Sequence, residues 1–145
     1  MSQAVSPAFQ ITMPSDGRYL HLVRAVVDGA ARRIGFSAED LHTIALAVTE
    51  AVTNVIRHVY DNATDQRIDL TLHPSSRTLR LEITDYGTYV DPATIASRPL
   101  EDVRPGGLGV HLIKSTMDEV AYQRNEHGGT TLTLVKSPKS EKDPT

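Results

Sequence analysis

The sequence predicts an α+β domain, a two-layer α/β sandwich in which helices cover one face of a mostly antiparallel sheet. Two long stretches near the start, 17–35 and 38–59, carry apolar residues at helical spacing. Segments 67–73 and 77–85 alternate apolar and polar residues across a short Pro-Ser-Ser turn, and 120–136 has the same character around two glycines. Because the strands come in hairpins and the helices cannot all be crossovers, we expect a mostly antiparallel mixed sheet.

The first half of the chain is expected to supply one strand and two helices. Residues 9–13 form a short apolar run, and the first helix ends at Gly35. The second helix begins with a capping-box pattern, in which Ser37 accepts from the amide three residues on and Asp40 reaches back. Helical periodicity gives this second helix one sheet-facing stripe. The stripe consists of Leu41, Ile44, Val48, Val52, Val55 and Val59.

The second half is expected to hold a loop, a helix and a hairpin. Regular patterning is absent from 86–107, which is longer than an ordinary connection, so we interpret it as a loop that orders on demand. Helical spacing returns over 108–120, and the last hairpin closes around the Gly128–Gly129 turn. The charged, proline-containing end, 137–145, is expected to be a disordered tail, which leaves 1–136 as one domain.

The composition limits the classes of function. A chain of 145 residues can build one domain with a proper core, and 39% hydrophobic with 23% charged residues is typical of a soluble globular protein. The net charge of -3 gives no electrostatic footprint for nucleic acid or an anionic membrane, so neither is expected as a direct partner. With no cysteine, a disulfide framework or a thiolate metal site is excluded. No leader or membrane-length apolar run occurs, so we expect a cytoplasmic protein.

A column of three polar residues stands on the second helix. Glu50, Asn54 and His58 recur every fourth residue and therefore lie on one side, away from the apolar stripe. Such a column is more often a solvated face than a site, so a ligand-binding interpretation needs partners elsewhere in the chain. The same side is expected to carry Thr43, Ala47, Thr53 and Arg57.

Three other segments can supply those partners. Asp85 ends a strand, where its carboxylate can accept from an exocyclic amine, and Gly87 lets the backbone come close to a flat ring, although Asp and Gly also form ordinary turns. Glycines that lead into a helix can bind phosphate or serve as a hinge. Thr130 and Thr131 open the last strand with hydroxyls that could reach a base. The glycines are Gly106, Gly107 and Gly109.

Taken in order, these blocks resemble the GHKL ATPase superfamily. The pattern is E-x-x-x-N-x-x-x-H on a helix, D-x-G after a strand, G-G-x-G before a helix and G-T-x-L near the end. The stretches TEAVTNVIRHVY and GGLGVHLIKSTMDEV are similar to the stand-alone bacterial serine-protein kinases that act as anti-sigma factors. The resemblance covers the chain from its first strand to Lys136 and implies the Bergerat fold of that superfamily.

The resemblance also implies roles for the residues. Asp85 would bond the adenine amine, Gly87 would give the ring room, and Thr130 would join the adenine network. Asn54 would bind Mg²⁺ that bridges the phosphates of ATP, and Glu50 would orient and deprotonate the incoming hydroxyl. His58 would line or support the phosphate end and Arg104 would neutralise charge near the γ-phosphate. The phosphate cradle would consist of Gly106, Gly107, Leu108 and Gly109, and the lid of residues 88–105.

The implied function is that of an ATP- and Mg²⁺-dependent serine/threonine kinase and anti-sigma factor. Such proteins phosphorylate a STAS-domain anti-anti-sigma antagonist, sequester a sigma factor and pair as homodimers. Two alternatives stay open on the motifs alone: a nucleotide-gated anti-sigma module with little kinase activity, and an activator-type kinase of STAS proteins that binds no sigma factor. His111 departs from the family pattern, in which an aromatic or aliphatic residue often follows the glycines.

Overall fold

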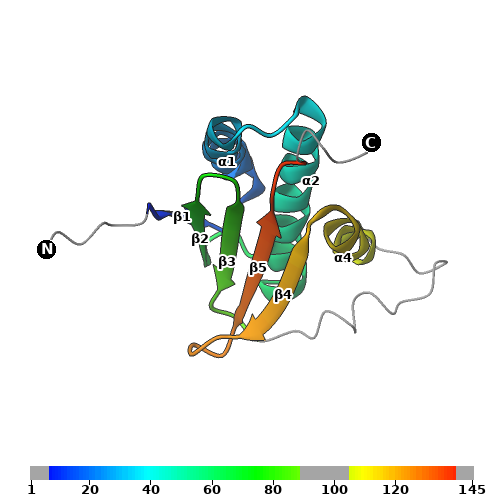
Figure 1. Ribbon diagram of the computed structural model, residues 1–145. Helices are drawn as coiled ribbons and strands as arrows, with labels where there is room; N and C mark the ends of the chain where they lie inside the picture. Colours follow the sequence, from blue (N-terminus) through cyan, green and yellow to red (C-terminus); the bar gives the residue numbers. More distant parts are fainter. Residues whose placement is uncertain (1–6, 89–104, 140–145) are drawn as a thin grey trace, which may run out of the picture.

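The computed structural model describes residues 7–88 and 105–139 and shows a five-stranded antiparallel sheet with helices packed on one face (Figure 1). The strand order is β1-β2-β3-β5-β4, and every pairing is antiparallel. The prediction of an α+β domain with a mostly antiparallel sheet is confirmed. The strands are β1 (Phe9–Pro14), β2 (Arg67–Pro74), β3 (Leu79–Asp85), β4 (Glu119–Arg124) and β5 (Thr130–Lys136).

Three α-helices and two short helical turns complete the described chain. A 3-10 turn, η1 (Gly17–Tyr19), precedes α1, and a π-helical turn, η2 (Val55–Val59), follows α2 directly. Within the described residues, no helix is long and apolar enough to cross a lipid bilayer. The α-helices are α1 (Leu20–Ile34), α2 (Ala38–Asn54) and α4 (Pro105–Thr116).

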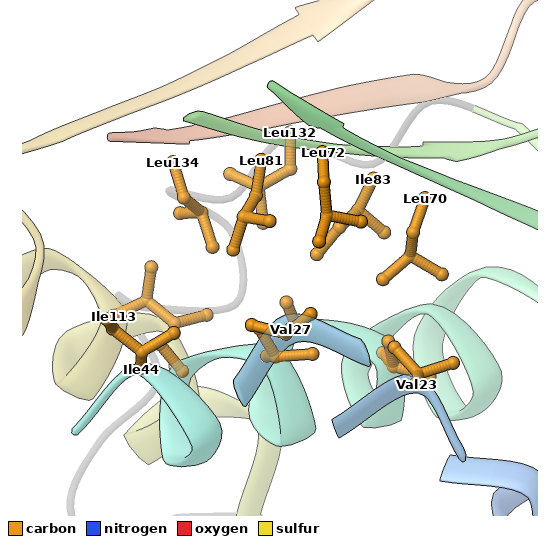
Figure 2. Packing of buried hydrophobic residues seen from close by; sticks show 14 of the residues in the cluster. Val23, Val27, Ile44, Leu70, Leu72, Leu81, Ile83, Ile113, Leu132 and Leu134 are labelled. Atoms are coloured by element: carbon orange, nitrogen blue, oxygen red, sulfur yellow. The ribbon is translucent and has the colours of Figure 1, made fainter. Parts of the chain in front are cut away.

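The core lies between the helices and the sheet. Figure 2 shows Val23 and Val27 of α1, Ile44 of α2 and Ile113 of α4 facing the strand side chains. Of the predicted stripe on the second helix, Ile44, Val48 and Val52 are buried, and the other members are partly buried against the same core. Ala47, which was predicted to share the side of Glu50 and Asn54, is completely buried, so this side of the helix is not a solvated face along its whole length. The strand side chains labelled in Figure 2 are Leu70, Leu72, Leu81, Ile83, Leu132 and Leu134.

The helix boundaries agree with the predicted signals at the start and depart from them later. Gly35 ends α1 in the left-handed conformation (φ 103°), and the Ser37 hydroxyl accepts from the Asp40 amide at 3.1 Å. The second helix does not run as one α-helix to residue 59, since α2 ends at Asn54 and gives way to the π-helical turn.

The predicted helix 108–120 starts earlier and ends earlier than its periodicity suggests. Proline is favoured in the first turn of a helix, and α4 begins at Pro105, so Gly106 and Gly107 lie in its first turn and Gly109 in its second, rather than before the helix. At the other end, Lys136 Nζ donates to the Thr116 carbonyl oxygen at 2.6 Å, and the Asp118 amide donates to the Val135 carbonyl oxygen at 2.9 Å. Pairing with β5 therefore overrides helical propensity after Thr116.

Candidate functional site

Asp85, the last residue of β3, is a buried carboxylate with two backbone donors. Its Oδ1 accepts from the Thr130 amide at 3.1 Å and from the Gly87 amide at 3.2 Å, and the residue is 2% exposed. Burial raises the pKa of Asp85, and the two amide bonds oppose this shift because they favour the charged form. Backbone amides from two separate segments thus hold one oxygen of the carboxylate.

The β4–β5 hairpin fixes the carbonyl end of the same residue. Asn125 Nδ2 donates to the Asp85 carbonyl oxygen at 2.9 Å, while Asn125 Oδ1 accepts from the amides of His127 and Gly129. A methyl group at Gly129 would lie 2.3 Å from the Asp85 carbonyl oxygen, so only glycine permits this approach. Neither Asn125 nor Gly129 was predicted as a site residue, although an Asn before a Gly-Gly turn is a typical Asx-turn signal.

Thr130 lies beside Asp85 on the helix-covered face of the sheet. Its Oγ1 is buried and has no hydrogen-bond partner in the described part of the chain. Thr131 does not share this place: its hydroxyl pairs with that of Thr84 at 3.2 Å on the opposite face. Of the two threonines that were considered for base contacts, the structure brings only Thr130 to Asp85. A buried hydroxyl without a partner is suited to a bound polar ring.

The α2 side of the site carries Glu50 and Asn54, both half-buried. Asn54 Oδ1 is buried and accepts no hydrogen bond from any described residue. An amide oxygen is a hard ligand of the kind Mg²⁺ accepts beside phosphate oxygens and water, so the residues present fit a bound Mg²⁺. His58 follows inside η2 and is also half-buried.

The π-helical turn brings the end of α2 against the segment after Asp85. Its hydrogen bonds span five residues, as between the Tyr60 amide and the Val55 carbonyl oxygen at 3.0 Å. A methyl group at Gly87 would lie 2.2 Å from Val59 Cγ1. The structure therefore shows a packing reason for glycine at this position, in addition to the predicted room for a ring.

The predicted phosphate-binding glycines lie at the start of α4. Gly106, Gly107, Leu108 and Gly109 lie in its first turns, and α4 packs against α2. The first amides of a helix have no intrahelical acceptor and attract anions. Arg104 and nearly all of the predicted lid lie outside the described residues.

A family match decides the assignment of the fold. The profile described as "histidine kinase-like ATPase domain" matches residues 13–136, which is most of the chain. The chain belongs to this family. The matched range includes every predicted site residue from Glu50 to Thr130, so all of them lie within the histidine kinase-like ATPase domain.

Curated relatives place the domain more narrowly. The serine-protein kinase RsbW of Halalkalibacterium halodurans is 32% identical over 88% of this chain and 81% of its own length. The serine-protein kinase RsbW of Staphylococcus epidermidis is 31% identical over 96% of this chain and 92% of its own length. At these identities and coverages the chain is a member of the RsbW group of anti-sigma factor serine kinases.

A solved structure supports the fold. The crystal structure of the RsbU and RsbW domains of a Mycobacterium tuberculosis protein matches with a TM-score of 0.63 and 23% identity. The match covers 93% of this chain, which spans 33% of that longer chain. This likeness concerns the architecture of the sheet and its helices.

Proposed function

We propose that the chain is an ATP-dependent protein serine/threonine kinase and anti-sigma factor. Its substrate would be a serine or threonine of a STAS-domain anti-anti-sigma protein, and its second partner a sigma factor. One observation carries the catalytic part: Asn54 Oδ1 on α2 and Thr130 Oγ1 on β5 are both buried without a partner among the described residues. Buried polar atoms are normally satisfied, so the pair supports a polar ligand that spans the site.

The nucleotide is assigned to residues by their chemistry. Asp85 Oδ1 is already engaged by two amides, and the carboxylate remains the acceptor for the exocyclic amine of adenine, with Thr130 Oγ1 beside it. The first-turn amides of α4, at Gly106 and Gly107, would hold phosphate oxygens, with Gly109 in the following turn as part of the same glycine-containing segment. Asn54 would bind Mg²⁺, which neutralises phosphate charge when ATP is bound.

Glu50 would act on the protein substrate. It lies one helical turn before Asn54 on α2, so its carboxylate shares the metal side of the site. From there it would orient the substrate hydroxyl and accept its proton as the oxygen attacks the γ-phosphate. Arg104 remains the predicted cation near that phosphate.

A homodimer is part of the proposal and has support on the α1 side of the molecule. β1 is an edge strand, and Phe9 on it is 55% exposed. Leu22 and Val26 share one side of α1 and are 55% and 45% exposed. Phe9 and Val26 also line an apolar groove of about 850 Å³.

A cytoplasmic location stays a prediction. It follows from the proposed sigma-factor partner.

The test is phosphate transfer from γ-labelled ATP to STAS-domain proteins of the source organism in the presence of Mg²⁺. Label is expected on one serine or threonine, and Glu50→Gln should slow transfer at least about a hundredfold while ATP still binds, because general base catalysis is lost. Transfer by Glu50→Gln at the parent rate would remove Glu50 from its role.

A pull-down with the organism's sigma factors tests the second activity. Capture of a sigma factor would exclude an activator-type kinase that binds none. No label on any STAS protein, together with ATP binding and sigma capture, would instead identify a nucleotide-gated anti-sigma module. Absence of a sigma factor at every nucleotide state would contradict the anti-sigma part of the proposal.

A further inference from the structure

Tyr60 is a buried residue directly after η2, and its hydroxyl joins two distant backbone segments. The hydroxyl accepts from the Tyr86 amide at 2.7 Å and donates to the Arg67 carbonyl oxygen at 2.5 Å. Burial is the largest influence on the pKa of Tyr60 and raises it, so the hydroxyl keeps its proton at neutral pH and can donate and accept together. Tyr60 thus links the helix that carries Asn54 to the segment that leaves Asp85.

The end of η2 and the segment after Asp85 are also tightly packed against each other. A methyl group at Gly87 would meet Val59 Cγ1 at 2.2 Å and Tyr60 Cε1 at 3.3 Å. Because hydrogen bonds in a π-helical turn span five residues, Val59 and Tyr60 occupy different positions around the helix axis from those of a continuous α-helix. The π-helical turn therefore sets the contact between η2 and Gly87.

Tyr86 is held from the sheet side as well. Its hydroxyl donates to Asp69, a buried carboxylate of β2, and the Arg67 guanidinium lies 5.2 Å from the centre of its ring. These contacts hold the Tyr86 side chain against β2 and do not involve Tyr60. Tyr60 supplies a hydrogen bond from the helix side, and it does so at the Tyr86 backbone, one residue after Asp85.

We infer that Tyr60 is a positioning residue for the nucleotide, which fixes the Asp85 carboxylate relative to Asn54 through its bond to the Tyr86 amide. The inference rests on the proposed function, since it takes Asp85 as the adenine contact and Asn54 as the Mg²⁺ contact. One nucleotide must contact Asp85 and Asn54 at the same time. If the distance between these two residues changes, the nucleotide can no longer make both contacts with good geometry, although either contact alone would still be possible. The effect is specific for adenine, because guanine presents a carbonyl oxygen where adenine presents its amine.

The test compares Tyr60→Phe with Tyr122→Phe by calorimetric titration with Mg-ATP and Mg-GTP. Tyr122 is a matched control, because its hydroxyl is buried and has no hydrogen-bond partner in the described part of the chain. In Tyr60→Phe the Kd for ATP should rise about tenfold while the Kd for GTP changes less than about twofold. Tyr122→Phe should leave both constants unchanged. A purely structural role would lower the thermal stability of Tyr60→Phe and leave the ATP/GTP preference intact, which would overturn the inference.

A second measurement covers the case in which Tyr60→Phe does not fold. In the unsubstituted protein, amide hydrogen exchange at Tyr86 should slow about tenfold when Mg-ADP is added, because the ligand locks a segment that Tyr60 already links to the helix. Unchanged exchange would contradict the inference.

The two proposals fail in different ways. An unsubstituted protein that shows no preference for ATP over GTP would sink the proposed function and this inference with it. An intact preference that Tyr60→Phe also retains would sink the inference alone.

Discussion

The two ends of the candidate site differ in how completely their polar groups are paired. Around Asp85, the carboxylate, the carbonyl oxygen and the next amide all have partners, namely Thr130, Gly87, Asn125 and Tyr60. At the end of α2, Asn54 Oδ1 is buried and no described residue donates to it. The groups that hold Asp85 in place are therefore paired within the protein, whereas Asn54 Oδ1 on α2, like Thr130 Oγ1 beside Asp85, has no partner among the described residues.

This difference separates two tasks. A network that is complete without ligand holds its atoms in place before binding, which lowers the entropy lost on association. A buried oxygen without a partner costs free energy in the unliganded protein and regains it when a cation arrives. We therefore expect substitutions at the Asp85 end to change stability, and substitutions at the α2 end to change function with little effect on stability.

The largest contrast is expected between two asparagine-to-alanine substitutions. Asn54→Ala should abolish Mg²⁺-dependent phosphate transfer, by at least about a thousandfold, because the metal ligand is lost. Its free energy of unfolding should stay within about 0.5 kcal/mol of the parent or rise, since the buried Asn54 Oδ1 accepts no hydrogen bond from the described residues that the substitution would remove. Asn125→Ala should instead cost about 2 kcal/mol, because three hydrogen bonds disappear.

Urea denaturation of both variants, with transfer assays beside it, measures the contrast. The comparison breaks if Asn54→Ala destabilises the protein as strongly as Asn125→Ala does, because Asn54 would then be a structural residue. A Thr53→Ala variant, at the preceding half-buried position of α2, controls for general perturbation of the helix.

A second contrast concerns Gly87, which donates to Asp85 and packs against Val59 of η2. In Gly87→Ala the added methyl group would overlap Val59 Cγ1, so the free energy of unfolding should fall by about 1–3 kcal/mol. Val59→Ala removes that atom, and the double variant should recover about 1 kcal/mol or more relative to additivity. Denaturation of the four proteins of this cycle gives the coupling directly.

Nucleotide titration of the same four proteins separates the two reasons for a glycine at 87. If the double variant regains stability and still binds ATP weakly, Gly87 also provides room for the adenine ring. If the cycle shows no coupling, the contact between Gly87 and Val59 does not limit this position.

Sequence periodicity predicted the elements well because burial on one face leaves a direct record in the chain. The β2–β3 and β4–β5 hairpins and the stripe from Ile44 to Val52 follow from alternation and helical spacing. The break of the second helix at Asn54 left no such record, since Val55–Val59 continues the same apolar spacing. A π-helical turn depends on what the next segment packs against, here Gly87, and that contact is set by tertiary structure.

The residues of the site also differ in how far the sequence could predict them. Motif spacing led to Asp85, Asn54 and Thr130, whose chemistry is carried by the residue type itself. Tyr60 and Asn125 act through bonds to the backbone of residues 26 and 40 positions away, and backbone partners are invisible to any motif. Residues that hold the site residues in place are therefore the part that required the structure.

The smallest expected effect has opposite signs for stability and for binding, and it lies at Asp85. Burial raises the pKa of this carboxyl above its unfolded value, so the folded protein binds the proton more tightly than the unfolded chain does. The contribution of this group to stability is therefore greatest below the unfolded pKa and declines as pH rises from there through the folded pKa.

Asp85→Asn should remove that decline and add about 0.5–1 kcal/mol of stability at neutral pH, because the amide oxygen can still accept from Thr130 and Gly87. The same change should weaken ATP binding about tenfold, since a neutral acceptor replaces a charge-assisted one. Denaturation of parent and variant between pH 4 and neutrality, with ATP titration at neutral pH, tests both signs; a loss of both stability and ATP affinity would make Asp85 a member of the framework rather than a ligand contact held by it.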